Sequence, residues 1–109
     1  REACRKFANE HGGIAVPGDL ESADGPAQVA RAVLDAGGGL DTLIHNAGFE
    51  AYLPLADYDM DAFDRILRVN LRARVELTHL LLPALRRSSN ASVINITSIH
   101  AAAASPNNS

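Results

Sequence analysis

The chain alternates between helical and strand-like segments with short connections, and this alternation limits the folds open to it. The strand-like segments are residues 14–16, a run that begins at Asp41, and residues 91–98. The helical segments are residues 2–10, a segment that begins at Pro26, and about residues 61–86. Strands that alternate with helices are joined by right-handed crossovers into a parallel sheet. We therefore predict an α/β fold, a Rossmann-like doubly wound parallel sheet with flanking helices, with about three strands and three helices here.

Local signals predict where the helices begin and end. Pro26 can occupy the first turn of the middle helix, and glycines at 12–13 and 37–39 stop the first two helices. Asp57 or Asp59 can cap the long helix. Apolar residues at helical spacing predict its core stripe, which consists of Phe63, Ile66, Leu67, Ala73, Leu77, Leu81 and Ala84.

Composition excludes several classes of protein. The 109 residues are 47% hydrophobic with a net charge of -3, which is typical of a globular domain. The ten basic residues form no block among the thirteen acidic ones, so we expect no nucleic-acid or membrane partner. The longest apolar run, residues 79–85, is far shorter than the roughly 20 residues that span a bilayer. The single cysteine, Cys4, disfavours a zinc site and fits a reducing, cytoplasmic location.

Each predicted strand ends in polar residues. The first leads to Asp19, the second to His45 and Asn46, and the third to Thr97 and Ser98. Ligands of an open parallel sheet bind in the crevice outside the carboxyl ends of its strands. Strand ends are also polar simply because they meet solvent. Three coincident polar ends, one of them followed by Ala-Gly, favour a binding edge.

Asn70 is a polar residue on the predicted core stripe of the long helix. A buried amide left unpaired costs about 1 to 3 kcal/mol, so we expect it to have a hydrogen-bond partner. A bond that only fixes the helix against the sheet and a functional bond both remain open. Ser98 lacks the G-x-S-x-G context of a nucleophile elbow, which argues against a hydrolase.

Three ordered motifs, "DTLIHNAG", "FDRILRVNL" and "SVINITSI", resemble those of the short-chain dehydrogenase/reductase family in its compact single-domain branch. The likeness runs from about residue 19 to residue 98. It implies an oxidoreductase that transfers hydride between a nicotinamide cofactor, NAD or NADP, and a small-molecule alcohol or carbonyl substrate. His45 stands where the family commonly has another Asn.

The resemblance also implies roles for individual residues in cofactor binding. Asp19 and Leu20 would meet the adenine of the cofactor. Asn46, Ala47 and Gly48 would stabilise the sheet edge and border the adenosine ribose.

Two further residues take catalytic roles by the same resemblance. Ser98 would hydrogen-bond the substrate oxygen, because a hydroxyl donor stabilises the negative charge that develops there during carbonyl reduction. Asn70 would hold the catalytic lysine of a proton relay, through its backbone carbonyl and a water.

Two parts of the family's machinery do not occur in this sequence. The glycine-rich phosphate turn would precede Arg1, and the Tyr-x-x-x-Lys pair would follow residue 109. Tyr52 and Tyr58 cannot replace that tyrosine, because both precede the long helix. We therefore expect residues 1–109 to be the central part of a single NAD(P)-binding domain, truncated at both ends and inactive alone.

Two other functions remain open. A cofactor-binding or regulatory homologue would keep the fold without the catalytic tyrosine and lysine. A different doubly wound domain could bind another nucleotide, but it would leave Asn46, Asn70 and Ser98 as a coincidence.

The long helix is apolar on a second face as well, formed by Val69, Leu71, Val75, Leu80 and Leu82. The family often pairs this helix across a subunit interface, which implies a homodimer or homotetramer when full length. Alternatively, a neighbouring helix of the same subunit covers this face.

Overall fold

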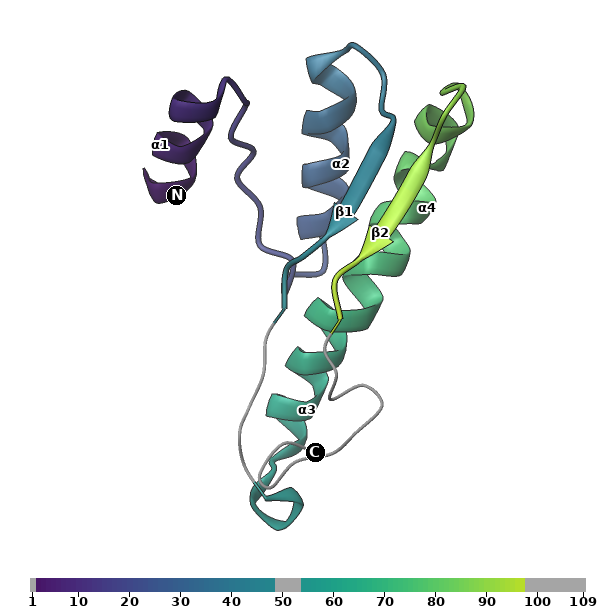
Figure 1. The fold of residues 1–109 in the computed structure, drawn as a ribbon. Coiled ribbons are helices and arrows are strands. Elements are labelled where there is room, and N and C mark those ends of the chain that lie inside the picture. Colours follow the sequence, from purple (N-terminus) through teal and green to yellow (C-terminus); the bar gives the residue numbers. More distant parts are fainter. Residues whose placement is uncertain (1, 49–53, 98–109) are drawn as a thin grey trace.

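The computed structural model describes residues 2–48 and 54–97, in which helices alternate with two parallel strands (Figure 1). Helices α1 (Glu2–His11) and α2 (Gly25–Ala36) precede strand β1 (Thr42–His45). The 3-10 turn η1 (Leu55–Asp57) leads into one long helical rod, and strand β2 (Ser92–Asn95) follows it. The rod consists of α3 (Met60–Leu67), the π-helical segment η2 (Arg68–Arg72) and α4 (Ala73–Arg86). This order confirms the predicted α/β class with a parallel sheet.

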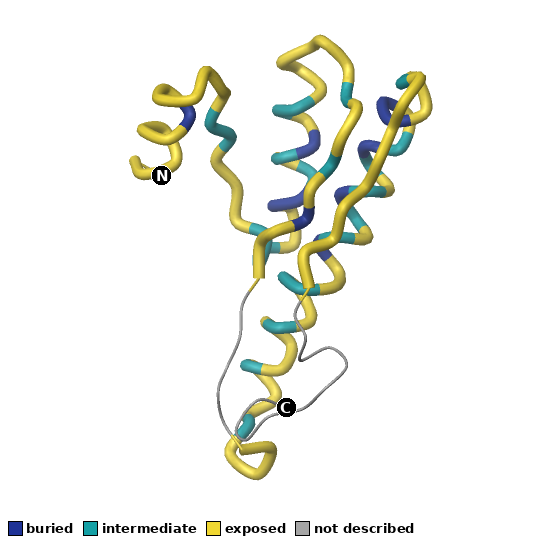
Figure 2. Tube along the Cα trace, in the orientation of Figure 1, coloured by how far each residue is buried: buried dark blue, intermediate teal, exposed yellow. Residues whose placement is uncertain are grey.

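The core lies where α2 and α4 pack against each other and against β1. Strands β1 and β2 are paired in parallel, with Thr42 opposite Ser92. The buried centre of the core consists of Ala30 of α2 with Leu77 and Leu81 of α4, and Leu43 of β1 packs against it. Figure 2 shows most of the buried residues on α2, on α4 and at the end of β1, and one more, Ala8, on α1. Helices α2 and α4 therefore cover one face of the sheet (Figure 1).

The strand predicted over residues 14–16 does not form, which corrects the sequence analysis. These residues belong to neither helix nor strand, and Ile14 is 76% exposed. A strand exists only through hydrogen bonds to a neighbouring strand, and within residues 2–48 and 54–97 only β1 and β2 pair. In the common doubly wound strand order 3-2-1-4-5-6, the third and fourth strands follow each other in the sequence but do not lie side by side in the sheet. The apolar run at residues 14–16 was therefore not enough to predict a strand.

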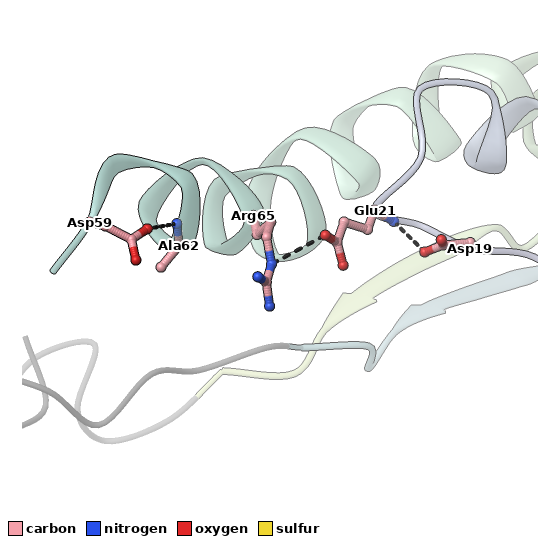
Figure 3. Close-up of polar contacts among 5 residues, drawn as sticks. All are labelled: Asp19, Glu21, Asp59, Ala62 and Arg65. Atoms are coloured by element: carbon pink, nitrogen blue, oxygen red, sulfur yellow. Dashed lines mark hydrogen bonds and ion pairs between the residues drawn. The ribbon is translucent and has the colours of Figure 1, made fainter.

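The long helix begins at a cap and is interrupted in the middle. Asp59, one of the two predicted caps, accepts a hydrogen bond at Oδ1 from the Ala62 N–H, 2.6 Å away (Figure 3). The π-helical segment η2 interrupts the helix predicted over residues 61–86, and Asn70 lies inside this segment. None of the helices in the described part of the chain is long and apolar enough to cross a membrane.

Four of the seven residues of the predicted core stripe are buried. Ala73, Leu77, Leu81 and Ala84 are buried, whereas Phe63 and Leu67 are 42% and 40% exposed. The difference arises because α3 extends past the ends of β1 and β2 (Figure 1), so that neither of the two described strands lies against it there. Periodicity predicted the apolar face of the rod correctly, but not how far the sheet extends along it.

Replacement of Leu81 by Ala should lower the free energy of unfolding of the intact protein by about 2 to 5 kcal/mol. The side chain is 1% exposed and contributes to the centre of the core, so its removal leaves a cavity. Chemical denaturation followed by circular dichroism measures the change. Leu55→Ala, at an exposed position, is the matched control and should change the free energy by about 0.5 kcal/mol or less. Equal losses in the two variants would contradict this placement of the core.

Candidate functional site

The carboxyl ends of β1 and β2 meet at one edge of the sheet, where the backbone ladder stops. In the last rung within the described residues, the Ile96 N–H donates to the His45 carbonyl at 2.9 Å. Beyond this rung the chain is neither helix nor strand at Asn46, Ala47 and Gly48, here called the 46–48 turn, or at Thr97; all four residues are exposed. Paired residues of the two parallel strands are 50 positions apart in the sequence. The parallel pairing thus brings two polar chain segments to one edge of the sheet.

Arg74 of α4 spans these two strand ends. Its Nη1 donates to the Ile96 carbonyl at 3.1 Å and its Nη2 to the Ala47 carbonyl at 3.2 Å. Its Nε is buried and has no acceptor among the described residues. The sequence motifs assigned no role to Arg74. The sequence feature that could have identified it is its positive charge directly after Ala73, a buried residue of the apolar stripe.

His45 points into the protein instead of lining the edge that its sequence position suggested. It is 5% exposed, and its Nε2 lies 2.8 Å from Oγ1 of Thr78 on α4. The Thr78 hydroxyl donates to the Arg74 carbonyl at 2.8 Å. Because that hydroxyl has a single proton, the hydrogen bond between His45 and Thr78 must be donated by Nε2–H. His45 therefore ties β1 to the helix that carries Arg74.

The environment of His45 disfavours its charged form. Burial removes water from the ring and is the larger cause, and the nearby Arg74 guanidinium adds repulsion. Both effects lower the pKa of His45 below the ordinary value of 6.5. At neutral pH the ring is therefore neutral and carries its proton on Nε2.

Asn70 approaches the 46–48 turn from the helical rod. It is half-buried, and its Oδ1 lies 3.6 Å from the position that a Cβ on Gly48 would occupy. π-Helical segments inside α-helices are rare and are frequent at functional sites. The structure thus brings together two of the regions that the sequence singled out, the 46–48 turn and Asn70.

Asp19 and Leu20 lie in a separate turn ahead of α2. The Asp19 carbonyl accepts hydrogen bonds from the Ser22 N–H at 3.1 Å and the Ser22 hydroxyl at 2.9 Å. A Cβ added to Gly25 would overlap this carbonyl, so the close turn requires glycine at the start of α2. Leu20 is half-buried and packs against the core. The side chain of Leu20 therefore has a structural role here.

An ion pair joins this turn to the helical rod. The Asp19 side chain accepts the Glu21 N–H at 2.9 Å, and the Glu21 carboxylate lies 3.2 Å from Nε of Arg65 on α3 (Figure 3). Both charged side chains are partly exposed, so the pair contributes about 0 to 1 kcal/mol at most. Ser98, the remaining predicted site residue, lies outside the described residues.

This chain is similar to known oxidoreductases along its whole length. The family model described as short chain dehydrogenase matches residues 1–109. The ketoacyl reductase HetN of Nostoc sp. is 34% identical over 86 residues, which cover 79% of this chain and 30% of that protein. The D-beta-hydroxybutyrate dehydrogenase of Rhizobium meliloti is 31% identical over 90 residues, which cover 83% of this chain and 35% of that protein. The chain thus spans about a third of the length of these relatives.

A solved structure has the same fold. The crystal structure of a metagenomic short-chain oxidoreductase in complex with NADP matches with a TM-score of 0.82 and 28% sequence identity. The match covers 99% of this chain and 50% of that one. The Rossmann-type α/β fold predicted from the sequence is therefore confirmed.

The lowered pKa of His45 predicts a specific pH dependence of stability. Between that lowered pKa and 6.5 the unfolded chain binds more protons than the folded one, so stability rises with pH in this window and falls on acidification. His45→Asn should therefore make the free energy of unfolding less dependent on pH between this lowered pKa and 6.5 than it is in the unmodified protein. Urea denaturation at a series of pH values measures both slopes. An NMR titration of the His45 ring with a midpoint at or above 6.5 would contradict the prediction.

Proposed function

Because this chain belongs to the short-chain dehydrogenase/reductase family, we propose that the whole protein is an NAD(P)-dependent oxidoreductase. It would transfer hydride between a nicotinamide cofactor and an alcohol or carbonyl carbon. The observation that carries this proposal is the meeting of the 46–48 turn, Asn70 and the end of β2 at the carboxyl edge of the sheet. An edge of this kind is where open α/β sheets bind ligands.

The residues at this edge fit the adenosine part of such a cofactor. The 46–48 turn is exposed, and Gly48 has no side chain to keep a ligand from its backbone. Asn46 would border the ribose, and from the separate turn ahead of α2 the exposed Asp19 and the half-buried Leu20 would meet the adenine. The NADP bound in the similar metagenomic structure supports the choice of cofactor class. We keep NAD and NADP as alternatives.

The proposed chemistry divides between Ser98 and Asn70. The nicotinamide, when bound, supplies or accepts the hydride. The Ser98 hydroxyl would donate a hydrogen bond to the substrate oxygen as negative charge develops on it. Asn70 would hold a water on its backbone carbonyl, and the π-helical segment around it supports this role, because the regular helical ladder is interrupted there.

The remaining parts of the machinery would lie outside residues 1–109. We propose that these residues are the central part of a single NAD(P)-binding domain, since they match about a third of the length of the curated relatives. On this proposal, the phosphate turn and the Tyr-x-x-x-Lys pair belong to the rest of the domain, and residues 1–109 alone are inactive. A cytoplasmic location is also a prediction.

We further propose that the intact protein is a homodimer or homotetramer. Leu71 and Val75 are exposed on the rod, on the second apolar face that the sequence predicted. Burial of such side chains favours association, by about 25 cal/mol for each Å² of apolar surface removed from water. Sedimentation of the intact protein tests this proposal.

The first experiment is a fluorescence titration of the intact protein with NADPH and with NADH. Binding of either one is expected, followed by turnover with carbonyl and alcohol substrates. D-3-hydroxybutyrate is a reasonable first substrate, because one relative is named for it. Binding without any turnover would favour the regulatory homologue, and no binding of either cofactor would overturn the proposal.

Ser98→Ala should lower kcat by roughly 10²- to 10³-fold while the cofactor still binds. The physical reason is the loss of one hydrogen-bond donor to the charge that develops on the substrate oxygen. The matched control is Ser89→Ala, at an exposed serine between α4 and β2, which should keep the unmodified kcat. An unchanged kcat in Ser98→Ala would exclude the proposed role of this hydroxyl.

A further inference from the structure

We propose that Arg74 is a positioning residue that fixes the distance between the 46–48 turn and the end of β2. The inference rests on the proposed function, because the 46–48 turn would border the cofactor and the end of β2 leads to Ser98. Its two hydrogen bonds to the strand-end carbonyls, at 3.1 and 3.2 Å, would hold the cofactor side and the substrate side of the site at one separation.

The need for such a residue arises where the backbone ladder stops. The last rung joins Ile96 to His45, and Ile96 and Ala47 each lie just past the end of a strand, where their carbonyls point to no further rung among the described residues. Both of these carbonyls accept from Arg74. The guanidinium therefore adds one more cross-link between the strands, made by a side chain instead of the backbone. Without it, the 46–48 turn and the end of β2 would be joined by one cross-link fewer at the place where the ligands would bind.

An arginine suits this position better than a lysine. The guanidinium is planar and holds its donors in a fixed fork, so that two nitrogens reach two acceptors at a set separation. Hydrogen bonds from a charged donor are also roughly twice as strong as neutral ones. A lysine ammonium could contact either carbonyl, but it would not set the distance between them.

The backbone of Arg74 is held next to the core. Arg74 directly follows the buried Ala73 and lies one turn before the buried Leu77. Its backbone carbonyl accepts the Thr78 hydroxyl, which in turn accepts from His45 of β1. The main chain of Arg74 is therefore linked to β1 through Thr78 and His45, and its side chain bonds to Ala47 in the 46–48 turn that follows β1. The position of the guanidinium is therefore set by the buried residues that flank Arg74 on α4.

Loss of this fork should alter the site more than the stability of the fold. Ala47 and Ile96 are exposed, so water can replace Arg74 at their carbonyls. Water does not, however, fix the distance between two chain segments. A displacement of about 1 Å in an active site can cost roughly 10²-fold in rate. Arg74→Met should therefore raise the Kd for NADPH or NADH by roughly tenfold and lower kcat/KM by up to about 10²-fold.

The experiment compares Arg74→Met, Arg74→Lys and Arg86→Met in the intact protein. Arg86 is exposed in the last turn of α4, so its replacement is the matched control and should leave all readouts unchanged. The readouts are the Kd for NADPH and NADH, the steady-state kcat and KM, and amide hydrogen exchange by mass spectrometry. In Arg74→Met, exchange should become faster in residues 43–48 and 93–97 but not in α2. Arg74→Lys should show intermediate effects.

Three experimental outcomes bear on the proposed positioning role of Arg74. Unchanged cofactor affinity and unchanged exchange in Arg74→Met would overturn the proposal. Faster exchange throughout the protein, including α2, would also overturn it, because Arg74 would then be a residue of general stability. If the unmodified protein binds neither cofactor, the proposed function fails. Exchange at the two strand ends then decides by itself whether Arg74 fixes them.

Discussion

The packing of α4 against α2 and β1 is the interaction on which the rest of this structure depends. Small and large apolar side chains meet there: Ala30 of α2 packs with Leu77 and Leu81 of α4, and all three are buried. Full burial of one such leucine is worth about 1.5 to 3 kcal/mol. The exposed ion pair of Glu21 with Arg65 contributes less than that. The helical rod is therefore held by its apolar stripe rather than by its charges.

This packing determines what lies at the carboxyl edge of the sheet. Once α4 is fixed, Thr78 reaches His45 and Arg74 reaches the two strand-end carbonyls. The π-helical segment then carries the rod past the sheet and places Asn70 beside the 46–48 turn. Polar groups gather at this edge because a buried scaffold directs them there, while the exposed turn stays open to a ligand.

Sequence reasoning reached the fold class and part of the site. Alternating periodicities predicted α2, β1, the long helix and β2, and the three motifs indicated the family. It failed at residues 14–16, because a strand needs a partner and an apolar run says nothing about whether one is adjacent. It also placed His45 on the ligand edge, whereas the alternation of side chains along β1 directs it to α4. The assigned roles of Asp19, Leu20, Asn46, Asn70 and Ser98 stay predictions.

The sequence by itself determined the kind, order and approximate ends of most elements, because capping, glycine stops and hydrophobic period act between residues close along the chain. Only the tertiary structure decided the contacts of Arg74, which joins carbonyls 27 and 22 residues away in the sequence. It likewise decided the pairing of His45 with Thr78, 33 residues away. Such contacts depend on how two helices and two strands pack, and no local pattern records that packing.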